Sequence, residues 1–142
     1  MIKRLYEHHY VEEQRKYRGI EYTILFNKSG WRTAYLNVTG SVLQNLDCNN
    51  IDLDVHGGLT YSNDHLPFER ETPVNREFWY IGWDYAHLED GCDPDKTLEY
   101  FGTNYEAKIF NGLGLHCYSL EEVRNDCIEA INELHITGGK YE

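Results

Sequence analysis

Two short stretches of this sequence combine histidine, aspartate and glycine in a pattern that could carry chemistry. In the first, His56 ends an alternating apolar and polar segment and is followed by Gly57 and Gly58. The glycine pair would let a ligand or a second backbone approach the chain closely. On an extended strand, Asp52, Asp54 and His56 would share one face at intervals of about 7 Å. The alternative interpretation is a solvated strand face that ends in a β-bulge.

The second stretch places Asp84, His87 and Asp90 directly after an aromatic segment that ends at Trp83. Binding chemistry often lies where a rigid scaffold holds a polar group at the end of an element. If the two stretches pair, His56 comes near Asp84 and His87. Such a group could bind a divalent metal, or it could form a His–Asp pair that orients one imidazole. No H-E-x-x-H or similar spacing occurs, so we assign no metal and no cofactor.

Aromatic residues make up 14% of the chain, more than a small core requires. Most are expected in the core or on half-exposed sheet faces. Aromatic rings beside Arg32 and His56 could also stack a nucleobase or another planar ligand. We therefore predict a ligand-binding site, with no catalytic residue assigned, made of Arg32, Asp54, His56, Gly57, Gly58, Tyr61, Trp83, Asp84, His87 and Asp90.

An antiparallel sheet is the scaffold that the patterning predicts around this site. Residues 20–26 alternate as a half-buried strand does, residues 27–30 have turn composition, and residues 31–38 are rich in aromatic and β-branched side chains. Together they predict a hairpin. Residues 51–61 alternate as a further strand, and residues 78–83, which are bulky on both faces, predict a central one.

The clearest helix signal lies near the end of the chain. Ser119 and Glu122 have the spacing of a capping box, and apolar residues follow at helical spacing on one face: Leu120, Val123, Cys127, Ile131 and Leu134. Residues 1–18 predict a short N-terminal helix or arm that ends at Gly19, and the acidic run 84–99 predicts a solvated loop. The fold class expected is α+β: one domain, residues 1–142, with an antiparallel β-sheet and a C-terminal amphipathic helix packed on it.

Composition excludes several classes of protein. A chain of 142 residues with 41% hydrophobic side chains can bury a core and is not disordered. No apolar run is long enough to span a membrane. With 13 basic and 24 acidic side chains, the net charge of −11 disfavours direct nucleic-acid binding. The four cysteines form no C-x-x-C pair, and no secretory signal opens the chain, so we expect free thiols and a cytoplasmic location.

Two strings of the sequence together resemble a widespread group of small, largely uncharacterised proteins encoded by bacteriophages and prophages. The strings are VHGGLTYS at 55–62 and WYIGWDYAH at 79–87. The group's pattern is roughly V-H-G-G-L-T-[YF]-S, then, after a variable gap, W-[WY]-[FI]-G-[FW]-D-x-A-H-x-x-D. The resemblance spans about residues 20–135. It implies no established activity, but it implies these functional residues: His56, Gly57, Gly58, Tyr61, Asp84, His87 and Asp90.

The resemblance and the residue types suggest a phage accessory protein that acts against host defence. In this interpretation the protein binds and sequesters a small nucleotide-derived signal in the host cytoplasm. The first alternative is a hydrolase of a nucleotide-like substrate, with or without a metal, in which His56 or His87 is a general base or a metal ligand. The second alternative is an acidic inhibitor that binds a host defence protein. A homo-oligomer is compatible with each of them, and none involves a membrane.

Overall fold

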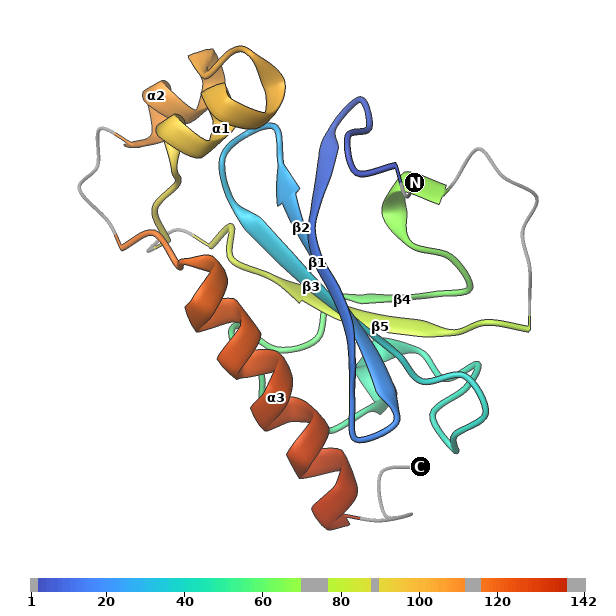
Figure 1. Ribbon diagram of the computed structural model, residues 1–142. Coiled ribbons are helices and arrows are strands. Elements are labelled where there is room, and N and C mark those ends of the chain that lie inside the picture. The colour runs from blue at the N-terminus through green and yellow to red at the C-terminus, as the bar shows by residue number, and fades with distance from the viewer. Residues whose placement is uncertain (1–2, 70–76, 88–89, 112–115, 138–142) are drawn as a thin grey trace.

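The computed structural model describes residues 3–69, 77–87, 90–111 and 116–137 (Figure 1). A five-stranded antiparallel sheet has the strand order β1-β2-β3-β5-β4. Its strands are β1 (His9–Tyr17), β2 (Ile20–Asn27), β3 (Arg32–Asn37), β4 (Tyr61–Asn63) and β5 (Tyr80–Asp84). The described helices are α1 (Pro94–Phe101), α2 (Tyr105–Asn111) and α3 (Leu120–Thr137), with 3-10 turns η1 (Cys48–Asn50) and η2 (Pro67–Glu69). The α+β class is therefore confirmed.

The predicted hairpin is confirmed as β2 and β3, in the register Ile24 opposite Ala34. The prediction that this segment is half-buried was wrong for most of β2, whose residues 22–26 are all buried. Ile24 belongs to the core beneath α3, whereas Leu25 belongs to a second apolar cluster on the opposite face. Both faces of the strand are covered, which a single alternating pattern could not reveal.

The predicted N-terminal helix was wrong, because His9–Tyr17 forms β1 and pairs with β2. The two residues between these strands, Arg18 and Gly19, both have positive φ, 49° and 85°. Two-residue hairpin turns of this kind match the twist of the strands that they join. Gly19 therefore closes a hairpin and does not end a helix.

The predicted strand at 51–61 was wrong for residues 51–60, since only Tyr61–Asn63 forms a strand there. The alternation of burial is nevertheless real: Ile51 and Leu53 are buried, whereas Asp52 and Asp54 are exposed. This segment packs its apolar side chains into the core without joining the sheet. The predicted central strand is confirmed as β5, which lies between β3 and β4.

The C-terminal helix α3 packs on one face of the sheet, as predicted (Figure 1). The Ser119 hydroxyl accepts a hydrogen bond from the Glu122 N–H, and the Glu122 carboxylate accepts one from the Ser119 N–H, so the capping box is formed. The helix buries one stripe against the sheet: Val123, Cys127, Ala130, Ile131 and Leu134. Part of the predicted acidic loop is helical instead, because Asp93 caps the N-terminus of α1.

The described helices lack the length and apolar character that crossing a bilayer would require. All four cysteines are free, and Cys92 and Cys127 are buried.

Candidate metal centre

Pairing between β4 and β5 brings the two chemically interesting stretches together. Tyr61 lies opposite Gly82 in this pairing, and one residue earlier the Thr60 N–H donates to the Gly82 carbonyl at 2.9 Å. The chain before Thr60 turns at the glycine pair, where the Gly58 N–H donates to the Val55 carbonyl. His56 is thereby placed beside the segment that follows β5. The predicted convergence of these two stretches is therefore present in the structure.

Asp90 is the centre of the resulting cluster. Its Oδ2 lies 3.0 Å from His56 Nε2 and 3.0 Å from His87 Nδ1. The same oxygen accepts a hydrogen bond from the His87 backbone N–H at 3.0 Å. Only 4% of the Asp90 side chain is exposed, whereas the two imidazoles are 23% and 38% exposed. One buried carboxylate thus links two accessible histidines.

The second ring nitrogen of His87 faces another carboxylate. His87 Nε2 lies 3.6 Å from Asp84 Oδ1. Asp84 is itself held in place, because Oδ1 accepts from the Ala86 N–H and Oδ2 from the Thr60 hydroxyl, each at 3.1 Å. A carboxylate that accepts the other ring N–H fixes the tautomer and orientation of a metal-binding histidine. At 3.6 Å, Asp84 faces His87 but lies beyond hydrogen-bond distance.

The His56 ring is enclosed by aromatic side chains. Tyr85 stacks on it at 4.7 Å with an interplanar angle of 13°, and Tyr118 lies 4.6 Å from it. The Tyr85 hydroxyl donates to Asp126 on α3 at 2.6 Å and accepts from the Trp83 indole N–H. Tyr85 is 1% exposed, so the surface that supports His56 is a rigid part of the core.

Electrostatics keep the Asp90 carboxylate ionised. Burial raises its pKa, but the hydrogen bonds from the His87 N–H and from both imidazoles outweigh burial. The pKa of Asp90 therefore lies below the ordinary value for aspartate. The ionised carboxylate is the form of Asp90 that can bind a cation, whereas each imidazole must release its proton toward Asp90 before the same nitrogen can bind the ion.

His56, His87 and Asp90 form a group whose ligand atoms lie close enough together to hold a metal ion. One ligand atom from each lies within 4.8 Å of the other two. Ligand atoms about 2.1 Å from a tetrahedral zinc ion lie roughly 3.4 Å apart. The two 3.0 Å contacts of Asp90 Oδ2 need to widen only by a few tenths of an ångström to admit an ion. The residue set also fits, since two imidazoles and one carboxylate are typical ligands of zinc and of non-haem iron.

A cleft of about 350 Å³ opens beside this cluster. The cleft lies between the loop before the glycine pair and α3. Its lining residues are Asp54, Val55, His56, Tyr118, Asp126 and Glu129. Three of these six residues are carboxylates, and His56 is the one lining residue that can become cationic. The cleft therefore favours positive charge near the imidazole.

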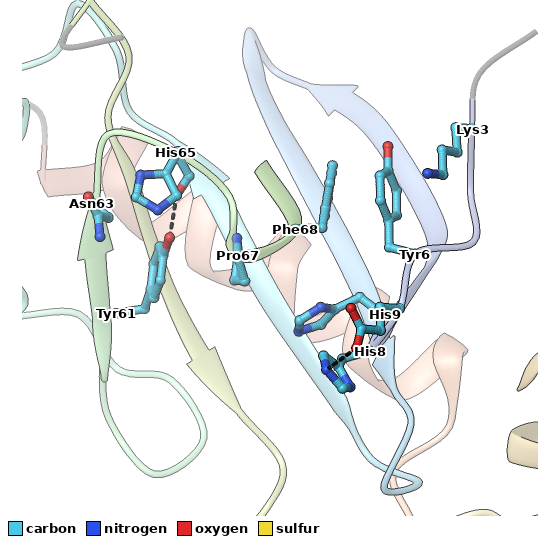
Figure 2. A pocket seen from close by; sticks show the side chains of 10 residues that line it. Lys3, Tyr6, His8, His9, Tyr61, Asn63, His65, Pro67 and Phe68 are labelled. Atoms are coloured by element: carbon cyan, nitrogen blue, oxygen red, sulfur yellow. Dashed lines mark hydrogen bonds and ion pairs between the residues drawn. The ribbon is translucent and has the colours of Figure 1, made fainter. Parts of the chain in front are cut away.

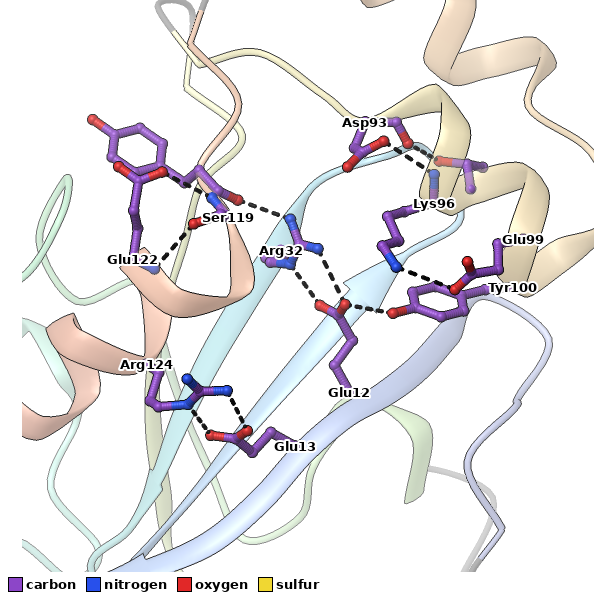
Figure 3. A network of polar contacts seen from close by, with 12 residues as sticks. Glu12, Glu13, Arg32, Asp93, Lys96, Glu99, Tyr100, Ser119, Glu122 and Arg124 are labelled. Atoms are coloured by element: carbon purple, nitrogen blue, oxygen red, sulfur yellow. Dashed lines mark hydrogen bonds and ion pairs between the residues drawn. The ribbon is translucent and has the colours of Figure 1, made fainter.

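Three of the predicted site residues lie outside the cluster. Arg32 is 3% exposed, and its guanidinium donates to the Glu12 carboxylate and the Tyr118 carbonyl (Figure 3). Trp83 is 1% exposed and faces the core. Tyr61 belongs to the opposite face of the sheet, where its ring packs edge-on against Tyr35. The structure thus assigns Arg32 and Trp83 to the interior.

Six of the remaining predicted residues lie at the cluster or its cleft: Asp54, His56, Gly57, Asp84, His87 and Asp90. Gly58 follows Gly57 in the turn, and a Cβ added there would meet nothing within 4 Å. Sequence reasoning missed four residues that complete the surroundings: Tyr85, Tyr118, Asp126 and Glu129. The two acids are three residues apart on α3, beside its buried stripe, and this spacing was the available signal.

The comparisons with known proteins give no match for this chain, whether with protein-family models, with curated proteins or with solved structures. The resemblance to a phage protein group therefore stays a prediction.

Proposed function

We propose that the protein binds one divalent transition-metal ion of the zinc class through His56, His87 and Asp90, and that it is a metal-dependent hydrolase. The observation that carries the proposal is the contact of one Asp90 oxygen with both imidazoles at 3.0 Å. The proposal takes up the hydrolase alternative that was predicted from the sequence. It differs from the sequence-based site prediction, which included no metal.

Three protein ligands favour a catalytic site over a structural one. Structural zinc sites are closed by four protein ligands, whereas catalytic sites keep a position for water or substrate. Among the described residues, the group that can hold an ion has three members, of which the two imidazoles are partly accessible. An ion bound there would lower the pKa of a coordinated water and so supply a nucleophile at neutral pH.

The neighbouring cleft gives a substrate access to this position, because His56 belongs both to the cluster and to the cleft lining. A free phosphate in the cleft would face Asp54, Asp126 and Glu129 and would be repelled. A bound divalent cation would offset part of this repulsion next to His56. Binding of a nucleotide-like substrate at His56 is thus expected to depend on the metal.

Metal binding is tested first, with Zn²⁺ as the probe. Isothermal titration of metal-free protein is expected to show one site, and metal analysis after dialysis is expected to show one equivalent. His87→Gln and Asp90→Asn are expected to abolish that site. His65→Gln is the matched control, since His65 also pairs with an aspartate, Asp64 at 2.9 Å, but belongs to no three-ligand group within the part of the chain that the structure describes. Equal zinc binding by all three variants would disprove the proposed centre.

Hydrolysis is tested next, with the zinc-loaded protein and a panel of nucleotides and cyclic nucleotides. The expected result is turnover that chelation and His87→Gln both abolish. If the ligand is recovered intact from heat-denatured protein, the hydrolase proposal is wrong and sequestration, the leading prediction from the sequence, is supported instead. Turnover that survives chelation would equally reject the role of the metal.

A further inference from the structure

A second cavity lies on the face of the sheet opposite α3 and is independent of the metal centre. Its volume is about 450 Å³, within the range of small-molecule sites. It opens between the segment before β1 and the chain from β4 to η2 (Figure 2). Beneath it, the apolar cluster that includes Leu25, Tyr35 and Tyr80 gives this face its own floor. The cavity is therefore supported by the core.

Aromatic rings form one side of this cavity. Tyr6 and Phe68 stack on each other with centroids 4.3 Å apart and an interplanar angle of 25°. Tyr61 also lines the cavity, and its hydroxyl donates to the His65 carbonyl, so the phenol group is already engaged within the protein. The lining thus offers aromatic surface against which a planar ring can pack.

Basic side chains gather at the same cavity, although the whole chain carries a net charge of −11. Lys3 lies over the Tyr6 ring, with Nζ 4.7 Å from the centroid. Three of the seven histidines also line the cavity, namely His8, His9 and His65. Among the lining residues that the structure describes, one is an acid, Glu7, whose Oε1 lies 3.3 Å from His8 Nε2.

His65 is oriented by a buried partner. Its Nδ1 lies 2.9 Å from Asp64 Oδ1, and the Asp64 side chain is 8% exposed. The Asp64 carboxylate can accept a hydrogen bond from Nδ1 and so hold the ring in one orientation at the cavity. The lining therefore combines aromatic surface with donors suited to an anionic group, in contrast to the acidic cleft beside His56.

We infer that this cavity binds a small anionic ligand with a planar ring, of which a nucleoside monophosphate is the simplest test case. The ring packs against Tyr6, Phe68 and Tyr61, and the anionic group meets Lys3 and the histidines. Binding at this site needs no metal. The inference does not rest on the proposed hydrolase activity. It places a ring-bearing anion beside Lys3 and not in the cleft lined by Asp54, Asp126 and Glu129.

The test uses metal-free protein in chelator, with AMP, adenosine and inorganic phosphate titrated separately. AMP is expected to bind saturably and at least about tenfold more tightly than either of its parts, because it uses both halves of the site. On the unaltered protein, NMR shift changes are expected at Tyr6, Phe68 and His65. Adenosine or phosphate binding as tight as AMP, no saturation, or shifts centred on Tyr118 would each overturn the inference.

Matched variants separate the two halves of the site. Lys3→Glu is expected to weaken AMP binding about tenfold, whereas the same charge change at exposed Lys16 on β1 leaves it unchanged. Phe68→Leu is expected to weaken it similarly through lost ring packing, and Phe78→Leu, at a residue 42% exposed, is its control. His87→Gln is expected to bind AMP normally. Loss of binding in His87→Gln, or equal effects of a variant and its control, would refute this site.

Discussion

Gly57 and His87 occupy adjoining space: a Cβ atom added to Gly57 would lie 2.3 Å from both Cε1 and Nε2 of the imidazole. The same addition at Gly58 would meet nothing within 4 Å. Both glycines have positive φ, 70° and 80°. The group that approaches the glycine pair is therefore the His87 side chain of the proposed metal centre. Of the two glycines, Gly57 is the one next to it.

This difference predicts distinct outcomes for Gly57→Ala and Gly58→Ala. Both variants place a Cβ at positive φ and are expected to lose about 1–2 kcal/mol in free energy of unfolding. Only Gly57→Ala must also displace the His87 ring, so we expect its zinc affinity to fall by at least about tenfold. Calorimetry on both proteins measures the difference. Equal zinc affinities would show that His87 is not held against Gly57 as a ligand.

Asp84 is expected to act as a positioning residue for His87. Asp84→Asn removes the charge facing Nε2 while it keeps the size of the side chain, and loss of such a partner costs about 10-fold to 100-fold in metal affinity. We expect zinc to bind more weakly by at least the lower figure, with no change in the number of sites. Asp52→Asn, at an exposed position, is the control. If Asp84→Asn binds zinc as tightly as the control does, Asp84 has no part in the centre.

The sequence predicted the strands and α3, because each depends on a local pattern. It predicted the convergence of His56 with Asp84 only on the condition that the two stretches pair. The capping box fixes where α3 begins, and β-branched and aromatic composition marks β3 and β5. Conversely, β1 was missed because Leu5, Tyr6, His9 and Tyr10 have helical spacing, and this stripe overlaps the start of the strand at His9. The pairing with β2 decides between helix and strand. Pairing between distant segments cannot be derived from the periodicity of one segment alone.

The position of Arg32 could not be predicted for the same reason, because it depends on a strand pairing that the sequence did not show. From its type, an arginine beside aromatic residues is a reasonable ligand for an anion. Its actual partner, Glu12, lies on β1, the strand that the sequence did not reveal. Without β1, nothing in the sequence indicates that this guanidinium is neutralised inside the protein.

The buried pair of Arg32 and Glu12 is expected to support the fold. Arg32 Nε lies 2.6 Å from Glu12 Oε1, and both side chains are about 3% exposed or less. Arg32→Met leaves the carboxylate buried and unpaired, so the free energy of unfolding is expected to drop by about 3–5 kcal/mol. The double variant with Glu12→Leu is expected to recover much of that loss, since no charge is stranded.

Urea titration measures these losses, with Lys96→Met as a control that breaks the exposed pair to Glu99 and costs about 1 kcal/mol or less. A loss in Arg32→Met no larger than in the control would contradict the structural role of Arg32.

Glu13 is expected to make stability depend on acid pH. Hydrogen bonds from Arg124 lower its pKa, against an opposing effect of burial, and the Tyr22 hydroxyl adds a further bond at 2.6 Å. Because the folded pKa lies below 4.5, this stabilisation is complete above pH 4.5 and is lost as the pH falls through the folded value. Glu13→Gln is expected to be less stable at neutral pH and to lose less on acidification. Glu99→Gln, an exposed control, is expected to follow the unaltered protein, and parallel acid profiles for all three would refute the assignment.

A Tyr85 variant can distinguish support of the fold from zinc binding, because the hydroxyl and the ring of Tyr85 contact different partners. The hydroxyl joins the Trp83 indole N–H, at 3.0 Å, to Asp126, whereas the ring stacks on His56. Tyr85→Phe removes both hydrogen bonds and leaves the buried indole N–H without its partner, so we expect a loss of about 1–3 kcal/mol in free energy of unfolding. Zinc affinity is expected to stay within about twofold, since the aromatic support of His56 remains.

Tyr17→Phe is the control for this loss of stability, because it removes one half-buried hydrogen bond to Asn132 on α3 and should cost less. Thermal unfolding and zinc titration of both variants give the two readouts. A large fall in zinc affinity with unchanged stability would reverse the interpretation and make the hydroxyl of Tyr85 part of the metal centre.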